Sequence, residues 1–227
     1  MNEQQKHARA ETPPPPRVSK GQLSRETILL TAARLATTSG LVGLSIGELA
    51  EAVGMSKSGL YAHFQSKEEL ELATIETAVG IFDREILQPG LNAPPGLQRL
   101  RLLFEGFLDH LERRVFPGGC FFAAAAAELD TRPGPARDRI VAILHDWLTL
   151  LGGCLVDARK LGEIDRRSDL DQATFEIEAL LVAANFLFVI NDDRSSLDRA
   201  RTGFQSLLRR LSPARATARR KRPVRGK

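Results

Sequence analysis

The sequence predicts an all-α protein, and three observations lead to this prediction. Apolar residues recur at the three- and four-residue spacing of amphipathic helices in every long segment after residue 24. Candidate capping residues precede these segments, and glycine or proline follows them. No segment of useful length alternates apolar and polar residues as a strand does, and no internal repeat is visible.

Four helices are expected in the N-terminal part, and a serine that can act as a cap stands at the start of each. Ser45 and Glu48 have the spacing of a capping box at the second helix. Pro89-Gly90 and Pro94-Pro95-Gly96 are expected to break the chain after the fourth. The expected helices cover residues 24–39, 45–53, 56–64 and 66–87.

Five further helices are expected, separated by segments rich in proline and glycine. They cover 97–115, 120–129, a long stretch from 135 past 151, 169–190 and 197–211. The domain organisation predicted from these elements is a small N-terminal domain at 21–68 and a larger one at 69–211. Residues 1–20 are expected to form a disordered, basic and proline-rich arm, and 212–227 a disordered basic tail.

The charge of the chain is concentrated in its tails. The 227 residues carry a formal net charge of +4, but residues 1–20 contribute +2 and residues 212–227 contribute +7. The body at 21–211 is therefore acidic, at −5. An argument for nucleic-acid binding must rest on local residues, because the overall charge does not describe the folded part.

Cysteine usage and hydropathy predict a cytoplasmic protein without a membrane partner. Cys120 and Cys154 are too few for a disulfide framework and lie in apolar surroundings, which is typical of reduced thiols. The first residues, MNEQQKHARAETPPPP, contain no apolar core of a signal peptide. The apolar run LLVAANFLFVI is shorter than a bilayer span.

The segment SIGELAEAVGMSKSGLYAHF has the spacing of a helix-turn-helix. Ala50 is small where two helices would cross, Gly54 suits the left-handed turn between them, and Leu60 would anchor the second helix on the first. A generic helical hairpin shares the glycine turn, but it does not require this order of cap, alanine, glycine and leucine. The second helix would present Lys57, Ser58 and their neighbours to a DNA groove.

This segment resembles the DNA-binding domain of the TetR family of bacterial one-component repressors. The resemblance extends over residues 25–72 and includes ILLTAARLATTSGLVGLS, SIGELAEAVGMSKSGLY, YAHF and SKEEL. The resemblance implies an N-terminal three-helix DNA-binding domain, joined by a connecting helix to a C-terminal helical domain for ligand binding and dimerisation. The segments PGGCFFAAAAAELDTRPGPARD and EIEALLVAANFLF resemble one subgroup of such regulatory domains.

The resemblance also assigns roles to single residues. Ser45, Tyr61, His63 and Lys67 would contact phosphates, while Lys57 and Ser58 would read bases. Ala62 stands where many relatives carry a larger polar residue, which leaves an apolar contact to a thymine methyl group open but argues against a hydrogen bond to a base at this position. The complete expected DNA-binding set is Ser45, Ser56, Lys57, Ser58, Tyr61, Ala62, His63 and Lys67. Taken alone, Tyr61 and His63 could equally be packing residues, and the basic residues of the N-terminal arm could enter the minor groove or stay solvated.

A regulator of this kind requires an effector pocket and a second subunit. Apolar side chains with a few polar groups suit a small apolar effector. The candidates are Phe104, Phe107, His110, Phe121, Phe122, His145, Trp147 and Asn185, although each apolar one could instead belong to the core. A helix that is apolar on more than one side, at 169–190, suggests a homodimer rather than a wholly buried central helix. The expected interface residues are Phe175, Leu180, Leu181, Leu187, Phe204 and Leu208.

No enzyme motif competes with this interpretation. The chain lacks the G-x-S-x-G, G-x-x-x-x-G-K-[ST] and G-x-G-x-x-G patterns, and its histidines and cysteines lack metal-ligand spacing. We therefore expect no catalytic residues, metal or cofactor. The function expected is a homodimeric repressor that binds a palindromic operator in double-stranded DNA and is released by a small apolar effector. A small-molecule carrier or enzyme, or a protein-interaction adaptor, on the same fold remains the alternative.

Overall fold

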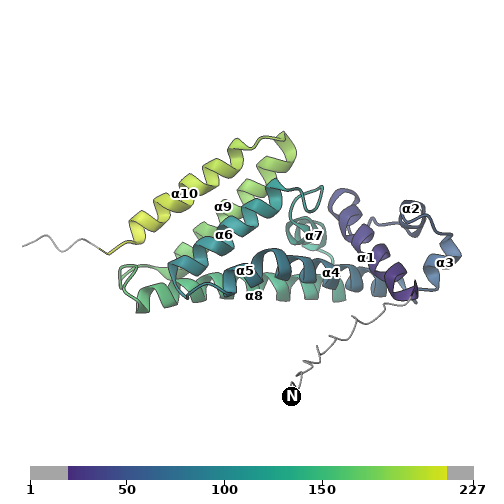
Figure 1. Cartoon of the computed structure of the whole chain (residues 1–227), viewed down its shortest axis with the longest axis horizontal. Coiled ribbons are helices and arrows are strands. Elements are labelled where there is room, and N and C mark those ends of the chain that lie inside the picture. The colour runs from purple at the N-terminus through teal and green to yellow at the C-terminus, as the bar shows by residue number, and fades with distance from the viewer. Residues whose placement is uncertain (1–19, 214–227) are drawn as a thin grey trace, which may run out of the picture.

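The computed structural model describes residues 20–213, with side chains from Arg25 onward, and confirms the all-α fold class. Over this part of the chain every regular element is helical. Most of the predicted arm and tail lies outside the described residues. The elements, labelled in Figure 1, are α1 (Lys20–Ser39), α2 (Ile46–Ala52), α3 (Lys57–Tyr61), α4 (Lys67–Phe82), the π-helical turn η1 (Asp83–Leu87), α5 (Gln88–Leu91), α6 (Leu97–Glu112), α7 (Phe121–Leu129), α8 (Pro135–Lys160), α9 (Leu170–Asn191) and α10 (Ser195–Leu211).

The first three helices and the start of α4 enclose a small core of their own. Its buried residues are Ile28, Ala32, Leu44, Leu49, Ala50, Leu60, Phe64 and Leu70. Leu29, Leu35, Ile46 and Val53 pack against this cluster as half-buried residues, whereas Ala36 of α1 belongs to the larger core. A core of this size holds the short α2 and α3 in place, because neither helix could bury enough surface alone.

The remaining helices form a larger bundle with a second, continuous core. In Figure 1, α8 runs along the molecule beside α4; α6 and α9 pack on α8, and α10 packs on α9 and α6. The rings of Phe104 on α6 and Phe204 on α10 stack with their centroids 4.0 Å apart. The bundle therefore includes α10, whose apolar face is turned inward against its own subunit.

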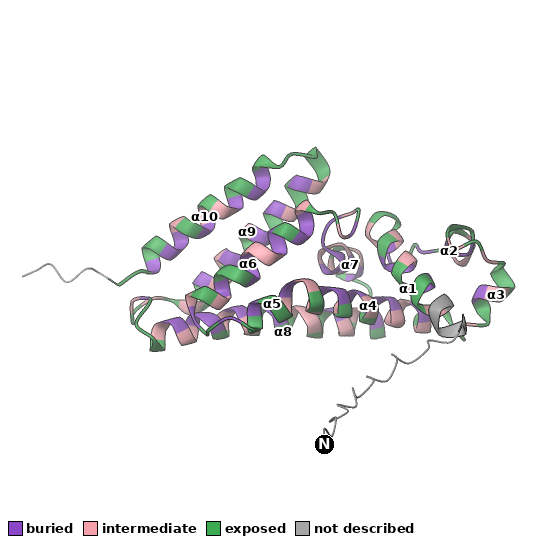
Figure 2. Ribbon diagram, in the orientation of Figure 1, coloured by how far each residue is buried: buried purple, intermediate pink, exposed green. Residues whose placement is uncertain are grey.

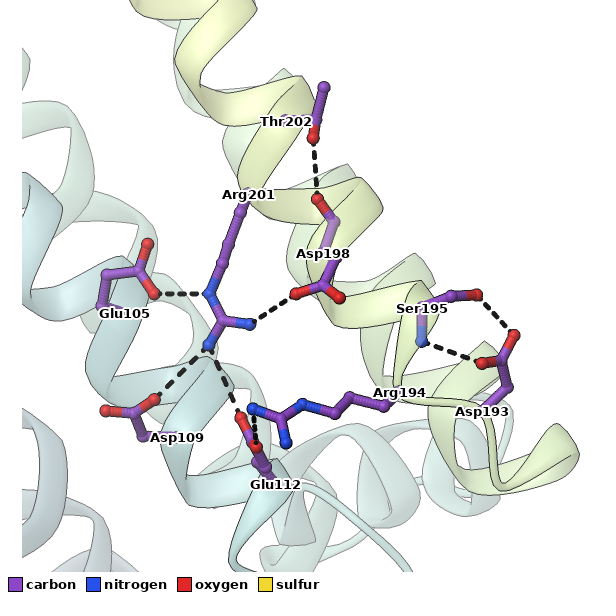
Figure 3. A network of polar contacts seen from close by, with 9 residues as sticks. All are labelled: Glu105, Asp109, Glu112, Asp193, Arg194, Ser195, Asp198, Arg201 and Thr202. Atoms are coloured by element: carbon purple, nitrogen blue, oxygen red, sulfur yellow. Dashed lines mark hydrogen bonds and ion pairs between the residues drawn. The ribbon is translucent and has the colours of Figure 1, made fainter.

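A network of ionic contacts also fixes α10 to α6 (Figure 3). Arg201 donates from Nε to Glu105 at 2.9 Å, and its other nitrogens lie 3.2 Å from Asp198, 3.5 Å from Asp109 and 3.7 Å from Glu112. Only 23% of the Arg201 side chain is exposed, so this guanidinium is held among carboxylates at the seam between the two helices.

The expected break at Pro89-Gly90 is wrong. The helical path continues from α4 through the π-helical turn and α5 to Leu91. Pro89, which lacks an N–H to donate, closely follows this π-helical turn, and such local departures from α-helical bonding are one way in which a helical path accommodates a proline. Gly90 is buried, and a Cβ there would lie 2.4 Å from Leu103 Cδ2, so this glycine permits the close approach of α6 instead of ending a helix.

Three helix ends also differ from prediction. Helix α1 begins at Lys20, before the Ser24 cap that we expected, and α3 already ends at Tyr61. Helix α10 begins at Ser195, whose N–H and hydroxyl both donate to the Asp193 carboxylate, at 2.8 and 2.5 Å. An aspartate that precedes the helix thus accepts a hydrogen bond from the N–H group of its first residue.

The Glu128 carboxylate connects α7 of the larger bundle to the N-terminal helices. Glu128 on α7 accepts hydrogen bonds from the backbone N–H groups of Leu41 at 2.6 Å, Val42 at 3.1 Å and Gly43 at 3.3 Å. These three residues form the connection between α1 and α2. The position of α7 therefore determines where the start of the helix-turn-helix is held.

Candidate nucleic-acid interface and ligand pocket

The helix-turn-helix is built from local signals that the sequence carries. The hydroxyls of Ser45, Ser56 and Ser66 accept hydrogen bonds from the backbone N–H groups three residues later, at 3.0, 3.1 and 3.0 Å. Gly54 has a φ of +67°, the left-handed conformation that turns the chain from α2 to α3. These serine caps and this glycine turn agree with the sequence prediction.

The predicted DNA-binding residues gather at one end of the molecule, around α3 (Figures 1 and 2). Seven of them are exposed, and His63 is half-buried. Tyr61 is 59% exposed although it is an aromatic residue, so the fold does not use it for packing. A cluster of exposed hydroxyl, amine and phenol groups on a helix-turn-helix is typical of a surface that contacts DNA.

Lys57 extends toward the start of α2. A Cβ on Gly47 would lie 3.2 Å from Lys57 Cε and 3.8 Å from Ser45 Oγ. The amine of Lys57 and the hydroxyl of Ser45 therefore both lie beside Gly47, although they belong to different helix starts. This juxtaposition combines a predicted base reader with a predicted phosphate contact.

Lys67 makes contacts within the protein. Its Nζ donates to the carbonyl oxygen of Val42 and lies 3.9 Å from Glu71 on the next turn of α4. The lysine side chain is still 51% exposed. It therefore lies beside the connection between α1 and α2, close to the start of α2.

Arg25 is a positioning residue that sequence reasoning did not identify. Its guanidinium donates to the carbonyl oxygen of His63, lies 4.5 Å over the Phe64 ring and pairs with Glu69 at 3.1 Å. A hydrogen bond from the Gln65 N–H and the pairing with Arg25 lower the pKa of Glu69. Arg25 thus fixes the turn between α3 and α4. No local pattern reveals this role, because its partners lie 38 and 44 residues away.

The larger bundle contains an apolar cavity of about 200 Å³, lined by residues of α4, α6, α7, α8 and α9. A neighbouring space of about 250 Å³ shares part of its wall. The residues that line the first cavity are Phe82, Phe107, Cys120, Phe122, Ala123, Ala126, Ile143, Leu144, Trp147, Glu178 and Val182.

Three predicted pocket residues line this cavity: Phe107, Phe122 and Trp147. The other predictions are wrong for this cavity. Phe104 is committed to its stack with Phe204, Phe121 and His110 are buried elsewhere in the core, and His145 is exposed. Asn185 has a structural role, because its Oδ1 accepts a hydrogen bond from the Cys120 N–H at 2.8 Å.

Two polar side chains, the buried His110 and the half-buried Glu178, have shifted pKa values. Burial lowers the pKa of His110 to about 4, and its Nδ1 has no hydrogen-bond partner in the described part of the chain. Glu178 lies in the cavity wall and accepts a hydrogen bond from Trp147 Nε1 at 2.9 Å. Burial raises the pKa of this carboxyl. Sequence reasoning missed Glu178, although a glutamate within an otherwise apolar helix was an available signal.

The outer side of α9 is an exposed apolar face, which we define by Phe175, Val182, Phe186 and Ile190. These side chains are 68%, 47%, 59% and 64% exposed. Of the residues predicted for the dimer interface, Phe175 and Leu187 are exposed, and Leu180 lies half-buried against Gly203 of α10.

The prediction is wrong for the other three interface candidates. Leu181, Phe204 and Leu208 are at most 3% exposed and belong to the core of their own subunit. Helical periodicity alone did not distinguish the two apolar sides of these helices.

Length and hydropathy alone would also allow α8 and α9 to cross a membrane, which corrects the expectation that the apolar run is too short. This is weak evidence, since core helices of soluble proteins pass the same test. Both helices supply buried residues to the bundle core.

The side chains that the structure describes form neither a cluster suited to a metal ion nor an activated thiol. Among them, no group of three or more histidine, cysteine, aspartate or glutamate residues is placed to hold a metal ion. Cys120 and Cys154 are buried free thiols, and burial raises the pKa of each to about 11. Neither thiol has the properties of an activated nucleophile.

Comparisons with known proteins agree with the two-part architecture. Residues 28–74 match the family model described as bacterial regulatory proteins of the tetR family, and residues 96–204 match a tetracyclin repressor-like C-terminal domain. The transcriptional activator FasR of Mycolicibacterium smegmatis is 33% identical over 88 residues, which cover 39% of this chain and 40% of FasR. The chain thus matches less than half the length of that relative.

Solved structures extend the similarity to most of the chain. A TetR transcriptional regulator from Chloroflexus aurantiacus superposes with a TM-score of 0.78 at 27% identity, covering 85% of this chain and 98% of that one. The structure of AibR in complex with isovaleryl coenzyme A and operator DNA has a TM-score of 0.65 at 24% identity, covering 84% and 98%, and shows the shared fold. Two domain matches in the expected order, on this fold, place the chain in the TetR family of bacterial transcriptional regulators.

Proposed function

We propose that the protein is a cytoplasmic, homodimeric transcriptional repressor that binds a palindromic operator and is released by a small-molecule effector. The observation that supports this most strongly is the exposed polar surface around α3, on a helix-turn-helix with every cap in place. The structural relative AibR is known in complex with operator DNA and an acyl thioester of coenzyme A. That precedent concerns AibR, and the proposal extends its general scheme to this chain.

In this proposal the surface around α3 enters a major groove. Lys57 and Ser58 read base edges, and Ala62 contacts a thymine methyl group. Tyr61, His63 and Lys67 contact phosphates, together with the serine hydroxyls at the start of α2 and α3. Lys67 would exchange its contact with the Val42 carbonyl for a phosphate oxygen.

The exposed apolar face of α9 supports the homodimer. Its four defining side chains occupy one side of the helix, and large aromatic groups at 59% and 68% exposure are unfavourable in water. A two-fold copy of α9 and α10 would cover them, and it would also place two reading surfaces on one duplex. Membrane association of the same face would instead appear as binding to lipid vesicles.

Helix α4 provides a direct path from effector to DNA. Phe82 at its C-terminal end lines the cavity, and Lys67 at its N-terminal end lies beside the DNA-reading surface. The 16 residues of α4 span roughly 24 Å at 1.5 Å per residue. A second path runs through α7, which carries cavity residues as well as Glu128. An effector releases DNA only if it binds the two arrangements with different affinity.

The proposal is tested by selecting bound sites from a random duplex library with the purified full-length protein at near-physiological salt. We expect a palindromic motif to be enriched, with the two half-sites related by the symmetry of the dimer. Enrichment of no motif, with binding that only fades as salt rises, would attribute the DNA affinity to non-specific charge. The carrier and adaptor functions would then be the remaining candidates.

A further inference from the structure

We propose that the effector is an apolar molecule with a cationic nitrogen, which pairs with the Glu178 carboxylate inside the cavity. This inference rests on the proposed function, because it assigns a chemical class to the ligand of the same regulatory pocket. Two observations support it: the residues that line the cavity, and the contacts of Glu178, which accepts a hydrogen bond from Trp147 but has no basic partner among the described residues.

The cavity wall combines aromatic rings with a single charge. Among the residues that line it, all in the described part of the chain, Glu178 alone is ionisable to a carboxylate and none is basic. The Phe82 ring lies edge-on to Phe122 and to Trp147, with centroids 5.4 Å away in each case. The Phe107 ring is stacked at 25° to Trp147, with centroids 6.4 Å apart.

Among the described residues Glu178 has neither a cationic partner nor a backbone N–H donor, whereas Glu128 and Glu163, which also lack an ion pair, each accept hydrogen bonds from backbone N–H groups. Glu76, Glu85 and Glu176 are each bound by an arginine, respectively Arg139, Arg113 and Arg210. For Glu178 the structure shows only the neutral indole N–H of Trp147, at 2.9 Å from Oε2. No basic side chain among residues 25–213 forms an ion pair with it.

A half-buried carboxylate without a counter-charge is less favourable than one in water, and this partial burial raises the pKa of Glu178. A ligand cation would supply the missing counter-charge in surroundings where water screens the attraction less than in bulk solvent. The aromatic faces around it would add cation–π attraction. A ligand carboxylate or phosphate at this position would be repelled by the same charge.

The size of the space is compatible with such a molecule. The first cavity, of about 200 Å³, and the adjoining space, of about 250 Å³, share Phe82, Phe122, Ile143 and Trp147. Arg139 and Asp146 border the second space, but Arg139 is already paired with Glu76 at 2.5 Å and Asp146 is exposed to solvent. The cation is therefore expected at the less accessible Glu178, with the apolar body of the ligand extending toward α4 and α8.

Trp147 makes the inference directly measurable, because it is the only tryptophan of the chain and lies in the cavity wall. We would titrate the full-length protein with 4-phenylbutylamine, 4-phenylbutanol and 4-phenylbutanoate, which share one apolar body and differ in head-group charge. Quenching or shift of the tryptophan fluorescence gives each dissociation constant. We expect the amine to bind about tenfold more tightly than the alcohol, and the carboxylate more weakly than either.

Two variants separate the charge from the shape of the pocket. Glu178→Gln keeps the size and one acceptor for the Trp147 N–H, so it should retain alcohol binding and lose the preference for the amine. Glu176→Gln is the matched control, since this glutamate lies on the same helix but pairs with Arg210 outside the cavity. Equal affinities across the three probes, or an amine preference that persists in Glu178→Gln, would overturn the inference.

The test distinguishes this inference from the proposed function. If the alcohol or the carboxylate proves to be the tighter ligand and releases a selected operator, the regulator proposal stands and the cationic assignment fails. If the amine preference is found but no operator is selected, the protein binds cationic ligands at Glu178 without acting on DNA. The cationic assignment then stands and the regulator proposal fails.

Discussion

Replacing Glu128 by alanine would remove the carboxylate that holds the connection between α1 and α2 against α7. Two of its three hydrogen bonds, to the Leu41 and Val42 N–H groups at 2.6 and 3.1 Å, are partly buried. Hydrogen bonds to a charged group contribute roughly 1.5–3 kcal/mol each. The third, to Gly43 at 3.3 Å, is exposed, so water can replace it.

Counting the two partly buried bonds at the lower value gives a loss of about 3 kcal/mol for Glu128→Ala. In a chain of this size that corresponds to a decrease in Tm of roughly 6–12 °C. Glu128→Gln retains an acceptor oxygen without the charge and should lose about half as much. Thermal unfolding followed by far-UV circular dichroism measures both effects, with Glu26→Ala, at an exposed position of α1, as the control.

The same variant tests the coupling between pocket and DNA. With the Glu128 contact removed, a cavity ligand should still change Trp147 fluorescence but should release a bound operator less effectively. A Tm for Glu128→Ala within about 1 °C of the wild type, together with unchanged ligand-induced release, would refute the assignment of Glu128 as an anchor between the domains.

Four further outcomes are expected. Lys67→Ala should weaken binding to all duplexes and reduce the salt slope by about 1, and Tyr61→Phe should weaken binding uniformly; unchanged operator affinity in both would remove these residues from the phosphate contacts. Lys57→Ala should alter the selected base preference, and a site profile identical to that of the wild type would contradict its reading role. Phe186→Glu should convert the dimer to a monomer in sedimentation velocity, because it places a charge in the apolar face of α9; a dimer that persists would exclude that face as the interface. The pKa of His110 falls from its ordinary 6.5 to about 4 in the folded chain, so the unfolded chain binds more protons between these pH values. The free energy of unfolding should therefore decrease as pH falls through this window. His110→Leu should show a shallower decrease, and equal slopes of unfolding free energy against pH would refute the contribution of His110.

The features that the sequence predicted well depend on near neighbours. Ser45, Ser56 and Ser66 cap helices through backbone groups three residues away, and Gly54 acts on a single turn. Such signals are contained within one short segment. The order of the helix-turn-helix elements is therefore predictable from the sequence alone.

The features that the sequence did not reveal depend on distant partners. Glu128 contacts residues 85 to 87 positions away, and Trp147 lies 31 positions from Glu178. Helical spacing marks Phe104, Phe121 and Phe122 equally as apolar, but only Phe122 borders the cavity. Which apolar residue fills the core and which lines a space depends on the crossing of helices, and a single sequence carries little information on that geometry.

The spacing of half-sites provides the most direct measurement of the central claim, that two copies of the surface around α3 read one duplex together. A selected palindrome would be compared with the same duplex lengthened at its centre by about 5 base pairs, half a helical turn. We predict that the insertion places the half-sites on opposite faces of the DNA and abolishes the high-affinity complex of two protomers. Unchanged affinity and stoichiometry on the lengthened duplex would contradict the claim that two copies read one duplex together.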